Sequence, residues 1–91
     1  MDMATKKKQL GRAVERERSK QKLTQRQLAY MADTTQAEIS KIENATSDVK
    51  VSTLIRISEA LGIEVREFFS FWRSRLETIR AVGTHAPTAL H

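Results

Sequence analysis

The chain of 91 residues contains no cysteine, only three glycines and only one proline. Without cysteine there can be no disulfide, no thiolate metal site and no thiol nucleophile. The absence is also usual for a cytoplasmic protein. So few glycines and prolines argue against a fold built from many tight turns. Strand-type alternation of apolar residues is nearly absent as well, so the predicted fold class is all-α.

Long apolar stretches are missing too. No apolar run approaches the ~20 residues that cross a membrane, and no secretory apolar segment follows the basic N-terminus. Charged residues are abundant, with 16 Lys and Arg against 11 Asp and Glu and a formal net charge of +5. A basic domain gains free energy by displacing counterions from phosphates, which is consistent with nucleic-acid binding. We therefore expect a cytoplasmic protein with no membrane partner.

Residues suited to catalysis are few and scattered. His85 and His91 lie in a predicted loose tail, with no acid or nucleophile held beside them. The acidic residues are spread over predicted helix surfaces, and the sequence has neither a glycine-rich phosphate loop nor a metal-ligand spacing. The sequence predicts no enzymatic activity, no metal and no cofactor.

The most informative segment is 24–44, which contains two helix-start signals. Thr24 is followed three positions later by Gln27, and Thr35 by Glu38 in the same way. This is the capping-box pattern, in which the Thr hydroxyl accepts from one free backbone N–H and the later side chain reaches back to another. Two short helices with a two-residue turn between them form a helix-turn-helix, a unit that suits insertion into a DNA groove.

Apolar periodicity predicts three further helices, before and after this segment. They run from Lys6 to about Gln21, over 51–62 and over 64–82. The fourth helix is expected either to be capped by Asp48 or to begin at Ser52. The domain organisation that follows is a flexible N-terminus at 1–5, a helix-turn-helix domain at 6–69, a C-terminal helix at 70–82 and a flexible tail at 83–91.

The order of these features over about 8–69 resembles the XRE family, the Cro and lambda-repressor type of helix-turn-helix domain. The residues that carry the resemblance are Leu23, Thr24, Gln25, Leu28, Ala29, Thr35, Gln36, residues 39–44, residues 54–62, Phe68 and Phe69. The resemblance implies a domain of five short helices in which the third is the recognition helix.

The resemblance also implies roles for individual residues, and the chemistry of the side chains agrees with most of them. The base-contacting positions are Gln36, Ala37 and Lys41, the backbone-contacting positions are Gln25, Asn44, Thr46 and Ser47, and Arg18 and Glu43 match a structural ion pair. A Gln amide both donates and accepts, so it can read adenine, while an Ala methyl suits a thymine methyl. Glu38 is open to two interpretations, as the capping residue or as an acceptor for a cytosine amine.

The chain departs from the family where glycine is usual at helix ends. Lys22, Asp33 and Ala45 stand at these positions. Asp tolerates left-handed backbone geometry reasonably well, whereas Lys and Ala adopt it less readily. We therefore expect the end of the first helix and the loop after the third to differ in shape.

Beyond the resemblance, the apolar face of the last helix continues at Trp72, Leu76 and Ile79. Exposed apolar surface of this kind usually marks an interface, so we predict a dimer interface made by Phe71, Trp72, Leu76 and Ile79. The alternative is that this helix folds back onto its own domain. The predicted function is a sequence-specific homodimeric repressor that binds double-stranded DNA at a palindromic operator. The alternatives are an antitoxin, whose toxin partner binds the C-terminal helix, and a restriction-modification controller protein.

Overall fold

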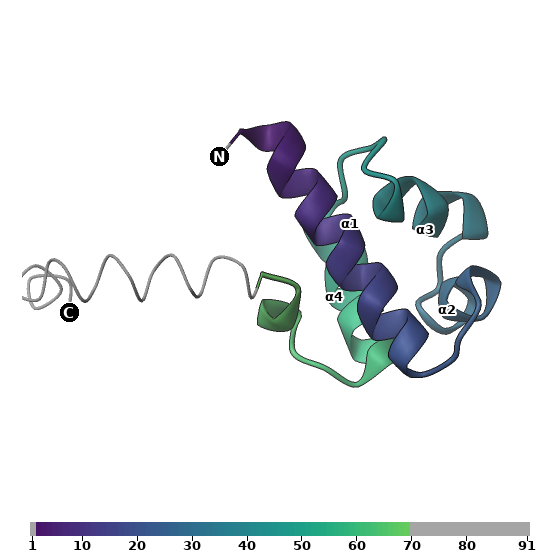
Figure 1. The fold of residues 1–91 in the computed structure, drawn as a ribbon. Helices are drawn as coiled ribbons and strands as arrows, with labels where there is room; N and C mark the ends of the chain where they lie inside the picture. Colours follow the sequence, from purple (N-terminus) through teal and green to yellow (C-terminus); the bar gives the residue numbers. More distant parts are fainter. Residues whose placement is uncertain (1, 70–91) are drawn as a thin grey trace, which may run out of the picture.

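The computed structural model describes residues 2–69, and every regular element in this part of the chain is a helix. It contains four α-helices and one 3-10 helix, namely α1 (Met3–Lys20), α2 (Gln25–Met31), α3 (Gln36–Glu43), α4 (Val51–Leu61) and η1 (Val65–Phe69). Figure 1 shows α1 running across the domain beside α4, with α2 and α3 on one side of α1 and η1 on the other. The predicted all-α class is confirmed. A fifth α-helix is not confirmed, because the fifth described element is η1. No helix within residues 2–69 is long and apolar enough to span a membrane.

The hydrophobic core draws on all five elements. Its buried apolar side chains are Ala13, Val14, Leu28, Ala29, Ala32, Ile39, Ile42, Leu54, Ile57, Leu61 and Phe68. Burying one of the larger side chains contributes about 1.5–3 kcal/mol, so this shared core accounts for much of the stability of the fold. On α4 the sequence pattern predicted too wide an apolar stripe. Val51 is 73% exposed and Ile55 is 42% exposed, because only one side of α4 packs on the core.

Two helices begin differently from the sequence prediction. Helix α1 starts at Met3 and not at Lys6, because the Asp2 carboxylate accepts a hydrogen bond from the Thr5 N–H (2.8 Å) and caps the helix. This hydrogen bond lowers the pKa of Asp2, so the cap is lost only when the pH falls through that lowered value. Helix α4 starts at Val51, with Lys50 as its N-cap residue and no side-chain cap. Both expected starts of α4 are therefore wrong.

The helix ends keep the usual geometry despite their unusual residues. Lys22, Asp33 and Ala45 adopt left-handed φ angles of 58°, 56° and 60°, close to the 70° of Gly62 at the end of α4. After each of the four α-helices, a backbone N–H reaches back to a carbonyl five residues earlier, as in Leu23 to Arg18 O (3.2 Å). This is the Schellman closure of a helix. The expected change of shape at the ends of α1 and α3 is therefore wrong. The chain keeps the usual closure even though residues with side chains stand at these left-handed positions.

The segment after α4 is not the continuous α-helix that its periodicity predicted. Residues Val65–Phe69 form the 3-10 helix η1, which places the ring of Phe68 fully in the core. Residues 70–82 and the tail 83–91 lie outside the described residues. The predicted C-terminal helix and its dimer interface therefore remain predictions.

Candidate nucleic-acid interface

The two helices of the helix-turn-helix start as their capping signals predict, but not equally. At α2 the capping box is complete, with Thr24 Oγ1 accepting from the Gln27 N–H (3.0 Å) and Gln27 Oε1 accepting from the Thr24 N–H (2.8 Å). At α3 the Thr35 hydroxyl accepts from the Glu38 N–H (3.1 Å). The Glu38 carboxylate makes no hydrogen bond or ion pair with any described residue. The capping interpretation of its side chain is therefore wrong.

Helix α3 lies at the outer edge of the domain (Figure 1), with one side facing the core and the other facing solvent. Ile39 and Ile42 are buried in the core, while Gln36, Ala37 and Lys41 are exposed. At 3.6 residues per turn the three exposed positions share the outer side of the helix. The structure thus presents all three candidate base-reading residues together on one exposed surface.

The candidate backbone-contacting residues have different surroundings. Asn44 and Thr46 are exposed, with Asn44 Nδ2 donating to Ser40 Oγ (3.2 Å) and Thr46 Oγ1 donating to Lys41 O (3.4 Å). The Ser47 Oγ is buried without a hydrogen-bond partner. Gln25 is half-buried, and its amide donates to the Glu43 carboxylate (3.0 Å). Asn44 and Thr46 are therefore accessible to a phosphate as they stand, whereas the Ser47 hydroxyl is not.

Arg18 and Glu43 meet in a two-point ion pair that joins α1 to the end of α3. Arg18 Nε and Nη2 donate to the two carboxylate oxygens of Glu43 at 2.7 and 3.0 Å, and Arg18 Nη1 donates to Leu23 O at 2.7 Å. The side chains are only 14% and 4% exposed. Hydrogen bonding to Glu43 raises the pKa of Arg18, so the guanidinium stays charged wherever the protein folds. With the Gln25 amide, three donors converge on Glu43 and fix the orientation of α3.

Two further residues position α3, although neither has a role in the sequence prediction. A Cβ placed on Gly11 would lie 2.5 Å from the Ile42 carbonyl oxygen and 2.7 Å from that of Glu43, so only glycine lets α1 approach the end of α3 this closely. The sequence signal is a glycine inside a helix, which commonly marks close approach. Arg56 Nε donates to Ala32 O (3.1 Å) and ties α4 to the turn between α2 and α3. No local pattern indicates that contact.

The matched segment of the chain decides its family. A helix-turn-helix family model matches residues 14–68, which covers α2, α3, α4 and most of η1. The chain belongs to the XRE-type helix-turn-helix family. It is a DNA-binding transcriptional regulator by family, and this is not a family of enzymes. The sequence-based resemblance is thereby confirmed.

Solved structures share the fold at low sequence identity. The restriction-modification controller protein C.AhdI from Aeromonas hydrophila has a TM-score of 0.69 and 22% identity, over 70% of this chain and 97% of that one. The clp gene regulator ClgR from Corynebacterium glutamicum has a TM-score of 0.68 and 20% identity, over 90% of this chain and 95% of its own. A Y37A mutant of the controller protein C.Esp1396I has a TM-score of 0.67 and 21% identity, over 88% and 96%. No curated protein matches the sequence significantly.

Proposed function

We propose that this protein is a homodimeric repressor that reads a palindromic operator through the outer side of α3. The observation that carries the proposal is the division of α3 itself. Its inner side is anchored by Glu43, while Gln36, Ala37 and Lys41 project from its outer side. A Gln amide can pair with adenine, an Ala methyl suits a thymine methyl, and a Lys can reach a guanine acceptor or a phosphate. With the Glu38 carboxylate free of its capping bond, it remains available as an acceptor for a cytosine amine.

The size of the reading surface supports a dimer. Helix α3 has eight residues, or about 12 Å at 1.5 Å per residue, so a single copy reads only a few base pairs. A two-fold dimer reads two half-sites about 34 Å apart and gains both affinity and length of readout. We keep Phe71, Trp72, Leu76 and Ile79 as the proposed interface. The exposed side chains of Val51 and Ile55 offer further apolar surface on α4.

Gln36→Ala tests the reading surface. Selection of bound DNA from a random pool first supplies the operator, which should be palindromic. The variant should bind this operator roughly tenfold more weakly, because it loses a paired contact to a base edge. Its affinity for unrelated DNA should not change, since phosphate contacts remain. Glu59→Ala, an exposed truncation on α4, is the matched control and should bind like wild type. Equal weakening of Gln36→Ala on both DNAs would contradict a base-reading role.

Trp72→Ala combined with Leu76→Ala tests the dimer. The wild-type chain should sediment as a dimer and the double variant as a monomer with unchanged helical content, because the two truncations remove the centre of the proposed apolar face. Glu77→Ala is the control, because at 100° per residue its position lies about 100° or more from each of Trp72, Leu76 and Ile79 around the predicted helix. An unchanged dimer in the double variant would place the interface elsewhere.

A second candidate is the controller of a restriction-modification system. Two of the similar solved structures, C.AhdI and C.Esp1396I, are described as such controllers, and this chain covers 97% and 96% of them. The neighbouring genes discriminate between the candidates. An adjacent restriction endonuclease gene would favour the controller, whereas an adjacent toxin gene would favour an antitoxin.

A further inference from the structure

Two opposite charges on α3 stand side by side without partners. Glu38 lies in the first turn of the helix and Lys41 in its last turn. Residues three apart on a helix are surface neighbours, about 5–6 Å apart between Cβ atoms, and Glu and Lys at this spacing commonly pair. Neither side chain makes an ion pair or a hydrogen bond with any residue of 2–69. Both charges are therefore available to a ligand.

The position of these two residues on the helix is next to the side proposed to read DNA. At 100° per residue, Glu38 lies about 60° from Lys41 around α3 and about 100° from Ala37. Lys41 is exposed and Glu38 is half-buried, so Glu38 marks the edge of the outer side. Along the helix axis the two residues are about 4.5 Å apart, close to the step of about 3.4 Å between stacked base pairs. One base pair, or two adjacent pairs, can therefore meet both side chains.

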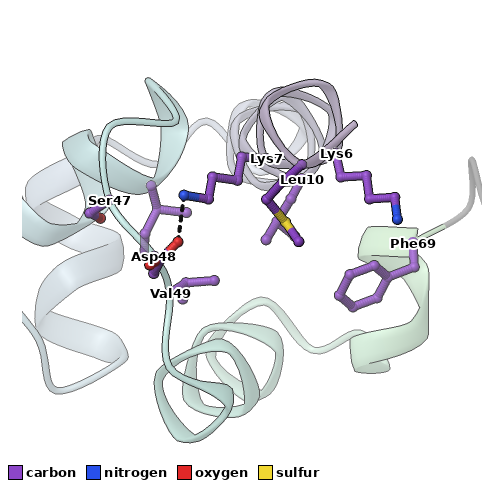
Figure 2. Close-up of a pocket in the computed structure, with 9 residues that line it drawn as sticks. Lys6, Lys7, Leu10, Ser47, Asp48, Val49 and Phe69 are labelled. Carbon is purple, nitrogen blue, oxygen red and sulfur yellow. Dashed lines mark ion pairs between the residues drawn. The ribbon is translucent and has the colours of Figure 1, made fainter. Parts of the chain in front are cut away.

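The contacts around α3 hold this pair in a fixed place. At the N-terminal end, the Thr35 hydroxyl accepts from the backbone N–H of Glu38 (3.1 Å). At the C-terminal end, Glu43 is engaged by donors from α1 and α2. The loop that follows is tied to α1 by the ion pair of Lys7 with Asp48 (Figure 2). Because Glu43 is engaged in this way, Glu38 is the one acid of α3 that remains for a ligand.

We propose that Glu38 and Lys41 together read a C·G base pair, an inference that rests on the proposed function of α3. In the major groove, cytosine presents its N4 amino group as a donor, and guanine presents O6 and N7 as acceptors. An ionised carboxylate only accepts hydrogen bonds and an ammonium only donates them. Glu38 thus matches the cytosine, and Lys41 matches the guanine of the same pair or of the adjacent pair.

The carboxylate makes this contact selective because it penalises the wrong base. Adenine also offers an amino donor, but its own N7 and the O4 of its thymine partner are acceptors on either side and repel a carboxylate. A carboxylate that finds no donor loses water without compensation, close to phosphates of its own sign. Glu38 therefore selects cytosine and also weakens binding to unrelated DNA, so part of the specificity comes from exclusion.

Glu38→Gln tests the acceptor half by removing the charge with little change of shape. Wild-type protein selecting from a random DNA pool should favour cytosine roughly tenfold at one position of each half-site. The variant should lose that preference or favour adenine, which a Gln amide pairs with. Its affinity for unrelated DNA should rise, because one negative charge near the phosphates is gone. Glu59→Gln makes the same charge change at an exposed site on α4 and is the matched control, with unchanged base preferences.

Lys41→Met tests the donor half. This variant should relax the guanine preference at the base pair that Glu38→Gln affects, or at the adjacent one. Lys8→Met, at an exposed position on α1, is the control and should alter no base preference. Uniform weakening of Lys41→Met on all sequences would place the ammonium on a phosphate and overturn the joint reading. Relaxed positions more than one base pair apart would overturn it as well.

Urea unfolding separates this role from a structural one. The cap of α3 uses the backbone N–H of Glu38, which glutamine keeps, so Glu38→Gln should unfold at nearly the wild-type midpoint. A lower midpoint with unchanged base preferences would mean that the charge serves only the helix dipole, and the proposal would fail. A wild-type chain that selects no site would contradict the proposed function itself. A wild-type palindrome whose base preferences do not respond to Glu38→Gln would refute only this reading of the C·G pair.

Discussion

Arg18→Met is expected to lower the free energy of unfolding by about 3–5 kcal/mol. The substitution removes the guanidinium that gives Glu43 two hydrogen bonds and leaves that carboxylate, only 4% exposed, with the Gln25 amide as its remaining partner. A buried charge that loses its counter-charge is far more costly than the loss of a surface pair, because water cannot replace the missing partner. Urea unfolding at neutral pH measures the change.

Arg16→Met is the matched control for this prediction. Arg16 also forms an ion pair, with Glu17 at 3.3 Å, but its own side chain is 48% exposed. Such exposed pairs contribute about 0–1 kcal/mol. The double variant Arg18→Met with Glu43→Leu should recover much of the lost stability, since it removes both charges together. Similar losses for Arg16→Met and Arg18→Met would show that the α1–α3 pair is not buried in solution.

Gly11→Ala is expected to lower the free energy of unfolding by about 2–3 kcal/mol, towards the upper end of the range for overpacking. The sign of this change in the free energy of unfolding is informative. Helix propensity alone predicts the opposite sign, because alanine is more favourable than glycine in a helix by about 1 kcal/mol. The added Cβ would meet two backbone carbonyls at the end of α3, and backbone cannot rotate out of the way as a side chain can. Relief requires α1 and α3 to move apart, which also shifts α3, the helix proposed to read DNA.

Urea unfolding and operator affinity together test this prediction. Arg12→Ala is the control, because Arg12 is the exposed neighbour of Gly11 on α1. This truncation should change the free energy of unfolding by less than about 0.5 kcal/mol. A Gly11→Ala variant as stable as wild type would mean that the two helices lie farther apart than the structure shows.

Features set by local sequence were predictable, and α2 and α3 are the clearest cases. Thr24 and Thr35 cap these helices as their spacing predicts, and the buried positions Ile39 and Ile42 follow the apolar period. The start of α1 was missed because the basic run Lys6–Lys8 separates Met3 from Leu10, while the Asp2 cap begins the helix before that run. The apolar period was therefore followed only from Leu10 onward.

Features set by contact between distant segments were not predictable from local pattern. The approach of Gly11 to Ile42 and the hydrogen bond from Arg56 to Ala32 O depend on how the helices pack. The direction of the Glu38 side chain depends likewise on its surroundings, and its capping-box spacing was a misleading guide. The 3-10 geometry of Val65–Phe69 also escaped prediction, because the apolar period of the segment is the same as that of an α-helix.

Three helix ends carry a non-glycine residue in the left-handed conformation, so a substitution to glycine at any of them would raise the free energy of unfolding. A non-glycine residue in that conformation costs about 1–2 kcal/mol, and Lys22, Asp33 and Ala45 each adopt it. Codons for aspartate and alanine differ from glycine codons by a single base, so mutation could relieve two of these turns easily. Proteins are commonly only as stable as their function requires. A destabilising change on the outer side of α3, where we propose that the protein reads DNA, could therefore be offset by one glycine at a helix end, and new operators would come within reach.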